Sequence, residues 1–317
     1  CEIISVDNYS NSTFETYNRI KQITGKEILH YEANVADSAA VEKIFSLHPG
    51  ITGVIHFAAF KSVPESVAKP EMYYRNNINS LINVLEIGRK YSLKHIIFSS
   101  SCSVYGNISA LPVNENTPFG KTESPYAYTK VVGEKIMEDV LRLAGTLRGI
   151  SLRYFNPVGA HSSGLLGELP NERPNNLVPV ITQTAIGKIK SFQVFGNDYT
   201  TRDGTCIRDY IHVCDIAEAH VLALRLLISN SAQPGYDVYN LGTGNGVTVL
   251  ETIKAFENIS GTKLNYEIVG RRAGDVAAIY SDSSKALSGL NWCTKRNLEE
   301  MMSSAWKWEQ HLAQSAT

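Results

Sequence analysis

Short apolar runs alternate with amphipathic stretches over the first half of the chain. The apolar runs, each typical of a buried strand, cover 2–7, 28–34, 53–60, 95–101 and 149–155. The stretches between them have helical periodicity and cover 13–24, 38–47, 64–91 and 126–144. Short strands that alternate with helices indicate βαβ units, so the pattern predicts an α/β fold with a doubly wound parallel sheet.

The second half of the chain has a weaker pattern. Segments rich in Pro, Asn and Gly surround one expected helix; the later elements expected are helices at 177–188, 213–229, 248–260 and 297–311 and a strand at 237–242. We therefore expect a doubly wound domain at 1–156 and a smaller α/β part at 157–317, with 209–260 packing back on the first domain. In such sheets ligands bind beyond the carboxyl ends of the strands, where we expect the functional residues.

Composition limits the classes of function. The net charge is −1, so no basic field predicts binding to nucleic acid or to an anionic membrane surface. No apolar run reaches the length of a membrane span. The five cysteines are widely spaced and contain no C-x-x-C pair, which argues against a disulfide framework or a metal site and favours a reducing, cytoplasmic compartment.

The segment ESPYAYTK, residues 123–130, carries the first candidate chemistry. Ser124 is a suitable N-cap and Pro125 suits the first helical position, so a helix begins here. Tyr126 and Lys130 then share one helical face at i and i+4. An ammonium beside a phenol lowers the pKa of the phenol, which predicts that Tyr126 acts as general base and acid. The alternative is a surface Tyr–Lys pair without catalytic function.

A serine cluster ends the apolar run at 95–101. Ser101 lies at the carboxyl end of this expected strand, 25 residues before Tyr126, where its hydroxyl can bond a substrate hydroxyl. The alternative is a strand exit whose hydroxyls satisfy local backbone groups. Ser101, Tyr126 and Lys130 together resemble the short-chain dehydrogenase/reductase superfamily, whose extended branch acts on nucleotide sugars.

Further blocks along the chain are similar to those of the UDP-glucose 4-epimerase family. They are DNYSNS (7–12), HFAAFKSVPES (56–66), YYRNNINS (73–80), RYFNPVGAH (153–161), PNNLVP (174–179), RDGTCIRDYIHVCDIA (202–217) and GRRAGDVAA (270–278). The resemblance implies a Rossmann-like, NAD-binding domain at 1–156 and a UDP-sugar-binding part at 157–317. It also implies a homodimer, formed by the helices at 64–91 and 126–144, that interconverts UDP-galactose and UDP-glucose.

The resemblance implies which residues hold NAD. Asp7 would hold the adenosine ribose and favour NAD over NADP, because a carboxylate repels a 2′-phosphate. The other implied cofactor residues are Asn8, Asn11, Ser12, Asn34, Val35, Phe57, Ala58, Ala59, Lys61, Asn76, Ser101, Tyr126, Lys130, Tyr154 and Phe155. Core packing is an alternative for Phe57 and Ala58. It explains Lys61 and Asn76 less well, since a buried ammonium or amide needs a partner.

The implied UDP-sugar site combines Ser101 and Tyr126 with residues of the second part. Arg208 and Arg272 would neutralise the diphosphate, and Asp275 would accept from a ribose hydroxyl. The other implied substrate residues are Asn156, Asn176, Leu177, Gln193, Val194, Phe195 and Ile279. Residues 176–177 begin an expected helix whose N-terminus suits a pyrophosphate, and 193–195 would flank the uracil. For each arginine a surface salt bridge is the alternative.

The implied reaction oxidises the sugar transiently at C4. Tyr126 takes the proton of O4 while hydride passes to NAD, and hydride then returns to the opposite face of the 4-keto sugar. Ser101 steadies O4, and Lys130 tunes Tyr126. Ile279 aligns with a position that gates the sugar pocket, and its intermediate size leaves UDP-N-acetylglucosamine 4-epimerase activity open as an alternative.

Three other classes of protein are alternatives. A nucleotide-sugar 4,6-dehydratase needs an acidic pair where this chain has Cys102 and Ser103. A dehydrogenase with net redox turnover would not need the residues implied for uridine diphosphate. A non-catalytic relative would not need the Ser, Tyr and Lys described above.

The chain departs from the resemblance at three places. The family commonly has Asp where this chain has Asn34 and Arg75. No G-x-x-G-x-x-G motif occurs, although the family carries it about two dozen residues before the position of Asp7. We therefore expect the natural protein to have a further strand and a glycine-rich loop before Cys1, and this chain to be a truncated epimerase fragment with weak or no activity.

Overall fold

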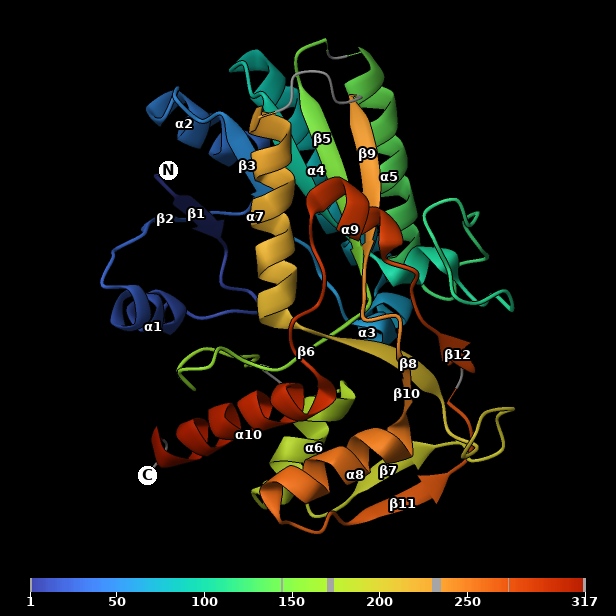
Figure 1. Ribbon diagram of the computed structural model, residues 1–317. Helices are drawn as coiled ribbons and strands as arrows, with labels where there is room; N and C mark the ends of the chain where they lie inside the picture. Colours follow the sequence, from blue (N-terminus) through green and yellow to red (C-terminus); the bar gives the residue numbers. More distant parts are fainter. Residues whose placement is uncertain (1, 144, 170–173, 230–234, 273, 316–317) are drawn as a thin grey trace.

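The computed structural model describes residues 2–143, 145–169, 174–229, 235–272 and 274–315. Cys1 and residue 144, the predicted end of one helix, lie outside these ranges. The elements form an upper part, which contains the main parallel sheet, and a lower part with shorter strands (Figure 1). Within the described ranges, no helix is both long enough and apolar enough to cross a membrane.

The upper part contains two parallel sheets. The larger sheet has four strands in the order β3 (Gly53–His56), β4 (His95–Ser101), β5 (Arg148–Tyr154) and β9 (Tyr236–Leu241). The smaller sheet pairs β1 (Ile4–Asp7) with β2 (Leu29–Glu32). All of these pairs are parallel, as the alternation of strands and helices predicted.

Helices cover both faces of the four-stranded sheet (Figure 1). One face carries α4 (Pro70–Lys90) and α5 (Pro125–Leu143), and the other carries α7 (Val213–Ser229) and α9 (Ser284–Leu290). The remaining elements of this part are α1 (Glu15–Thr24), α2 (Ser38–Leu47), α3 (Val63–Ala68) and the 3₁₀ helix η1 (Cys102–Tyr105). The helix predicted at 64–91 is therefore two helices, because Pro70 lacks an N–H donor and begins α4.

Strand β4 shows why the apolar runs are continuous. Its side chains alternate between the two faces of the sheet. Ile96 and Phe98 pack against the side of α4 and α5, while Ile97 packs against the side of α7 and α9. Both faces are buried, so every position of the strand favours an apolar or hydrogen-bonded residue. This arrangement confirms the doubly wound α/β fold.

Among the described residues, the lower part contains two small sheets and three helices. In one sheet β8 (Ile207–His212) pairs with β6 (Asn156–Val158), β10 (Gly246–Thr248) and β12 (Ala278–Ile279). In the other, β7 (Phe192–Phe195) pairs with β11 (Tyr266–Val269). The helices are α6 (Leu177–Ala185), α8 (Val249–Ser260) and α10 (Leu298–Ser315).

The segment 209–260, which was predicted to pack back on the first domain, contributes to both parts. α7 and β9 contribute to the upper core, but α8 lies in the lower part. The physical reason is the apolar face of α8, where Ile253 and Phe256 pack against Met301 and Met302 of α10. The chain returns to the upper part once more through α9.

Candidate functional site

The carboxyl end of the four-stranded sheet gathers Ser101, Tyr126 and Lys130. Ser101 ends β4, and its Oγ accepts a hydrogen bond from Ser103 N at 3.2 Å. Tyr126 and Lys130 lie in the first turns of α5, which begins where the sequence predicted. There the Ser124 hydroxyl accepts from Ala127 N at 3.2 Å. The strand exit and the helix start therefore bring the three predicted catalytic residues to one edge of the sheet.

The surroundings of Tyr126 raise its pKa. Burial of the hydroxyl is the main cause and the charge of an ionised Tyr154 adds to it, whereas a hydrogen bond with Ser101 lowers the pKa. The predicted lowering by Lys130 is therefore wrong for the chain by itself. Lys130 Nζ lies 5.8 Å from the centroid of the Tyr126 ring and donates to the Ser99 carbonyl at 2.7 Å instead.

Lys130 is almost completely buried, with 5% of its surface exposed. Besides the bond to Ser99 O, its ammonium lies 5.1 Å from the centroid of the Phe98 ring, which is a favourable cation–π contact. Burial lowers the pKa of Lys130 to about 8, although the charge of Glu134 opposes this effect. The charge of Lys130 therefore depends on its burial and on the charges next to it.

His56, at the end of β3, faces the same group and was not among the predicted site residues. It is 5% exposed, and burial together with the charge of Lys130 lowers its pKa to about 3. His56 is therefore neutral at ordinary pH. The sequence prediction placed His56 inside the expected strand at 53–60, whereas β3 ends at His56, so the signal was missed.

The residues that follow β5 were predicted to lie beside the nicotinamide. The Tyr154 hydroxyl hydrogen-bonds Ser99 Oγ, which ties the end of β5 to the end of β4. Phe155 is 2% exposed and packs with Tyr105 and Ile279. Tyr154 therefore lies close to Ser99, whose carbonyl accepts from Lys130, whereas Phe155 is packed in an apolar cluster.

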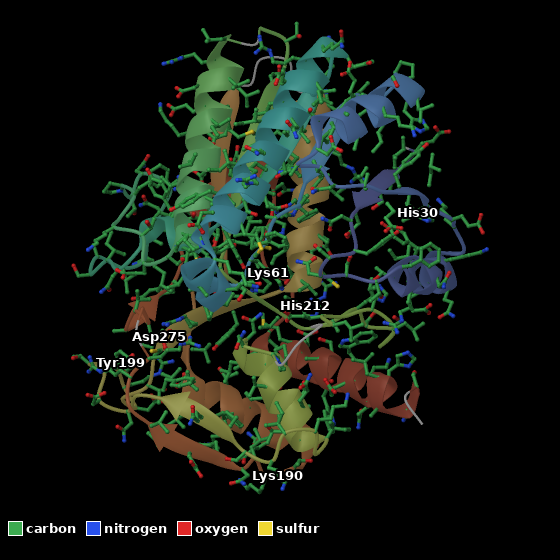
Figure 2. The ribbon with its side chains drawn as sticks, turned by 180° about the vertical axis from the view of Figure 1, so that it is seen from behind. His30, Lys61, Lys190, Tyr199, His212 and Asp275 are labelled. Carbon is green, nitrogen blue, oxygen red and sulfur yellow. The ribbon has the colours of Figure 1, made fainter. Side chains whose placement is uncertain are left out.

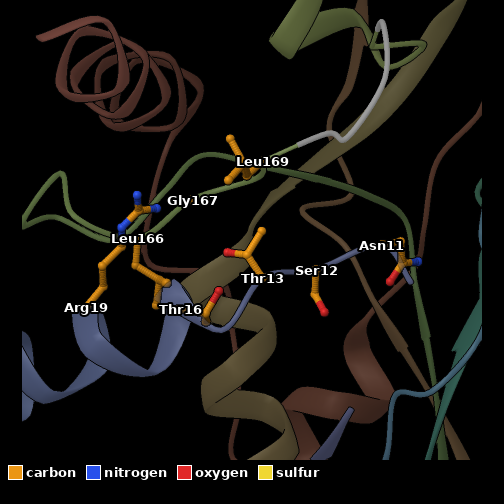
Figure 3. Close-up of a pocket in the computed structure, with 8 residues that line it drawn as sticks. All are labelled: Asn11, Ser12, Thr13, Thr16, Arg19, Leu166, Gly167 and Leu169. Carbon is orange, nitrogen blue, oxygen red and sulfur yellow. The ribbon is translucent and has the colours of Figure 1, made fainter. Parts of the chain in front are cut away.

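The predicted ribose residues lie after β1. Asp7 Oδ1 accepts from Tyr9 N and from Ser12 Oγ, both at 2.8 Å, while none of the described residues donates to its Oδ2. Asn11 and Ser12 line a pocket of about 140 Å³ together with Thr13, Thr16, Arg19 and residues 166, 167 and 169 (Figure 3). An Asp with an unshared carboxylate oxygen beside a polar pocket fits a ribose diol.

Three other predicted cofactor residues have local structural partners. Asn8 Oδ1 accepts from Ser10 N, and Asn34 Oδ1 accepts from Ala36 N at 2.9 Å, as in turns that Asn commonly stabilises. The Val35 carbonyl accepts from Asn83 Nδ2 at 3.0 Å, and its side chain packs against the core. These contacts fix the loops after β1 and β2, and they leave a ligand role as a prediction.

The segment after β3 presents an aromatic ring to its surroundings. Phe57 is 55% exposed, and its ring centroid lies 4.6 Å from that of His220 on α7. Core packing, the alternative for Phe57, is therefore wrong. The carbonyl of Ala58 accepts from Ser80 Oγ at 3.4 Å, and Ala59 follows it in the loop. An exposed ring at this edge of the sheet fits a planar cofactor.

Lys61 and Asn76 both have partners within the chain. Lys61 Nζ lies 2.9 Å from Glu168 Oε1, and Figure 2 shows Lys61 where the upper and lower parts meet. Asn76 Nδ2 donates to Asn77 Oδ1 at 3.0 Å. The buried residue is Asn77, whose amide bonds both the N–H and the carbonyl of Phe60. Asn77 was missed because two adjacent asparagines look equivalent in the sequence.

The lower part contains a pocket of about 510 Å³, a size that suits a small-molecule ligand. It brings together most of the predicted substrate residues, which are Asn156, Asn176, Leu177, Gln193, Val194, Phe195, Arg208, Arg272 and Asp275. Ser101, Tyr126 and Ile279 do not line this pocket. Ile279 is 5% exposed and belongs to the apolar cluster of Phe155, so its gating role stays a prediction.

Two arginines share one carboxylate in this pocket. Asp275 Oδ1 lies 2.9 Å from Arg272 Nη2 and 3.5 Å from Arg208 Nη2. Arg208 Nη1 also donates to the Val276 carbonyl at 2.7 Å, which fixes the guanidinium. Two positive groups against one negative group leave an excess positive charge, and guanidinium forks match phosphate oxygens.

The remaining wall of the pocket combines exposed and buried residues of β7. Gln193 is exposed, and the Arg272 guanidinium lies 5.1 Å from the centroid of the Phe195 ring. Val194 lines the pocket but is only 1% exposed and packs in the lower core. Glu168, which was not predicted, accepts from Asn176 Nδ2 at 3.1 Å as well as from Lys61, and no sequence motif marks it.

Cysteine and metal chemistry have no support among the described residues. Cys102, Cys206, Cys214 and Cys293 are free, and burial raises the pKa of Cys102 to about 12, so its thiol is a poor nucleophile. No group of three or more His, Cys, Asp or Glu side chains in these ranges is arranged to hold a metal ion.

Known proteins share both the sequence and the geometry. Residues 1–242 match the model of the NAD dependent epimerase/dehydratase family. The UDP-glucose 4-epimerase of Bacillus subtilis (strain 168) is 48% identical over 308 residues, which cover 97% of this chain and 89% of that protein.

Solved structures agree with this result. UDP-glucose 4-epimerase from Bifidobacterium longum, in complex with NAD+ and UDP, has a TM-score of 0.92 at 46% identity and covers 98% of this chain and 91% of its own. The enzyme from Stenotrophomonas maltophila, with bound NAD and formylated UDP-arabinopyranose, has a TM-score of 0.95 at 41% identity. The match covers 99% of this chain and 92% of that one. The chain therefore belongs to the NAD dependent epimerase/dehydratase family and, within it, to the UDP-glucose 4-epimerases.

Proposed function

We propose that the chain interconverts UDP-galactose and UDP-glucose by transient oxidation at the sugar C4, with NAD as a cofactor that stays bound. One observation carries this proposal. Ser101, Tyr126 and Lys130 lie together at the carboxyl end of the four-stranded sheet. The same chain contains a pocket of about 510 Å³ with two arginines suited to a diphosphate. The complexes of its relatives with NAD and UDP support the same ligands.

The upper part contains the residues that fit NAD. Asp7 would hold the adenosine ribose through its unshared oxygen, and the exposed ring of Phe57 would cover one side of the cofactor. Lys130 and Tyr154 would lie at the nicotinamide end. Bound NAD supplies the acceptor, and later the donor, of the C4 hydride.

Tyr126 would remove the proton of sugar O4 and return it when the product forms. Because burial raises the pKa of Tyr126, the phenolate needs a positive group nearby, and Lys130 is the ammonium on the same helical face. Ser101, which is hydrogen-bonded to Tyr126, would orient O4. Tyr126 and Ser101 would both act on sugar O4, so the same site would serve both directions of the reaction.

The lower pocket would anchor the nucleotide while the sugar turns. Arg208 and Arg272 would hold the diphosphate, and Asp275 would exchange one of its arginine bonds for a ribose hydroxyl. Anchoring through UDP leaves the 4-keto sugar free to present its other face. Binding and proton transfer are therefore assigned to different parts of the chain.

We also propose a homodimer that works in the cytoplasm. Ile82 on α4 and Tyr128 on α5 are 39% and 48% exposed, and two copies could bury these side chains against each other. The free cysteines are consistent with a reducing compartment. Sedimentation of the chain as a monomer at micromolar concentration would contradict the dimer.

Acid precipitation of the purified chain, followed by chromatography of the released nucleotide, tests the cofactor. A coupled assay that detects UDP-glucose formed from UDP-galactose tests the reaction. We expect NAD in a molar ratio near one and conversion without added cofactor. Release of NADP would contradict the role of Asp7. A chain with neither nucleotide nor conversion would contradict the proposed activity.

A further inference from the structure

A buried ion pair lies directly beneath the proposed catalytic group. Glu134 on α5 and Arg153 on β5 have side chains that are 3% and 5% exposed. Arg153 donates side-on, with Nη2 2.6 Å from Oε2 and Nε 2.9 Å from Oε1. The Ser100 hydroxyl donates to the same carboxylate. Burying two charges is costly in free energy, so the presence of this hydrogen-bonded ion pair in the core needs an explanation.

The pair is connected to the ends of β4 and β5. Ser100 precedes Ser101 on β4, and Arg153 precedes Tyr154 on β5. Arg153 Nη1 donates to the Tyr105 hydroxyl at 2.9 Å, and that hydroxyl lies 2.6 Å from Asn240 Oδ1 on β9. The network therefore joins α5, β4, β5, β9 and η1 at the edge of the sheet where Lys130 lies.

Glu134 also follows Lys130 by one helical turn on the same face of α5. The titratable groups around Lys130 and Tyr126 are His56 from β3, Tyr73 from α4, Cys102 from η1, Arg153 and Tyr154 from β5, and Tyr126 and Glu134 from α5. His56 is neutral there, with a pKa of about 3, and Cys102 is neutral, with a pKa of about 12. Of these described groups, Glu134 is the one that supplies negative charge.

We propose that Glu134 is a positioning residue for the Ser101–Tyr126–Lys130 group: its carboxylate, held by Arg153 and Ser100, keeps the Lys130 ammonium charged. Arg153 anchors the carboxylate, and Ser100 couples it to the strand that ends in Ser101. This inference rests on the proposed function for its catalytic meaning. The arrangement of charges itself can be tested without any activity.

Carbon-13 NMR of the full chain labelled with [ε-¹³C]lysine measures the titration of Lys130 directly, and its signal is identified by its absence in Lys130→Met. In Glu134→Gln we expect the midpoint to fall by about one pH unit, because the favourable charge is removed while the shape is kept. Glu134→Asp retains the charge and should stay close to the unchanged chain. An unaltered midpoint in Glu134→Gln would overturn the proposal.

A control comes from a second ion pair, in which only the carboxylate is buried. Asp215 on α7 is fully buried and bonded to Arg296, on the opposite face of the sheet from α5. Asp215→Asn should lower thermal stability, as Glu134→Gln does, yet leave the Lys130 midpoint in place. If Glu134→Gln does not fold, Glu134→Gln with Arg153→Met removes both charges and avoids an unpaired buried arginine. A smaller fall of the midpoint is expected there, because removal of the arginine charge offsets part of the loss of the carboxylate.

Kinetics then connect the charge to the reaction. In the chain with its bound cofactor, kcat should be lost at a lower pH in Glu134→Gln than in the unchanged chain. Above the midpoints of both chains, the kcat of the variant should be about 10-fold lower, with KM unchanged. A lower melting temperature with an unshifted profile would show a merely structural role and overturn the proposal. Failure of the unchanged chain to convert UDP-galactose would contradict the proposed function, and the NMR titration would still decide the role of Glu134.

Discussion

The two parts of the molecule hold their polar groups in different ways. In the upper part, Lys130, Glu134 and Arg153 are almost completely buried and bonded to the ends of strands. In the lower pocket, Arg272 pairs with Asp275 while its side chain remains 46% exposed. A buried network is costly to rearrange, whereas partly exposed ion pairs can exchange partners. The upper part is thus built to fix reacting groups, and the lower part to accept a charged ligand.

The largest effect expected from this comparison is on proton transfer. Tyr126→Phe removes one hydroxyl and should lower kcat by about 10²–10⁴-fold, because general acid–base catalysis is lost. Binding of UDP and the melting temperature should change little. Tyr128→Phe on the same helix is the control, since Tyr128 is 48% exposed. Comparable losses in both variants would remove Tyr126 from its assigned role.

The next effect concerns the stability of the upper part in acid. His56 and His220 are buried, and burial is the first cause that lowers their pKa values to about 3 and about 4. Above pH ~6.5 both are neutral in the folded and unfolded chain, so their contribution to stability is complete. As the pH falls below ~6.5, the unfolded chain binds protons first, and the free energy of unfolding decreases until the folded pKa values are reached.

Urea unfolding at pH 7 and pH 5 measures this decrease. We expect a loss of more than ~1 kcal/mol in the unchanged chain and a smaller loss in His56→Asn, compared within each variant. Equal losses in the two chains would mean that His56 does not contribute to the acid sensitivity.

A smaller effect is expected in the lower pocket. Arg272→Ala removes a charged contact to the diphosphate and should raise KM about 10-fold while kcat is largely retained. The neighbouring Arg271 provides the control, because it pairs with Asp198 and lies over the Tyr199 ring outside the pocket lining. Arg271→Ala should leave KM within about 2-fold, in keeping with an exposed ion pair. A large fall in kcat for Arg272→Ala would contradict the separation of binding from catalysis.

The smallest effect is expected where the two parts meet. Glu168 bonds both Lys61 and Asn176, so it links the loop after β3 to the start of α6. Glu168→Gln keeps hydrogen bonding and removes the charge, and we expect a change of about 2- to 5-fold in KM and none in stability, because the pair is exposed. Thermal unfolding and initial-rate kinetics on the same preparation check both expectations.

The sequence predicted the elements with strong periodicity well. The runs at 38–47, 95–101 and 213–229 are a helix, a strand and a helix with these same bounds, because their apolar positions pack against the sheet or form it. It missed the strands β6, β7, β8, β10, β11 and β12 and the helix α9. All of these strands except β8 are only two to four residues long, and they are defined by partners distant in the chain. Short strands of this kind carry no periodicity, so only the folded chain reveals them.

For the candidate site, too, the sequence predicted some residues and missed others. Motifs and resemblance located Tyr126, Lys130 and the arginines of the lower pocket, because residue type and spacing carry that information. The pKa of Tyr126 was predicted in the wrong direction, since it depends on burial and on where the Lys130 ammonium points. Glu134 and Glu168 were missed because their roles arise from contacts with Arg153 and Lys61, which are far from them in sequence.

The proposed reaction requires one chain to oxidise and reduce the same sugar carbon. UDP-[4-²H]galactose, incubated with the purified chain and analysed by mass spectrometry and NMR, tests it most directly. We expect UDP-glucose that retains deuterium at C4, with none released to water or to added NAD⁺. Product that carries protium at C4, or no conversion by a chain that contains NAD, would contradict it.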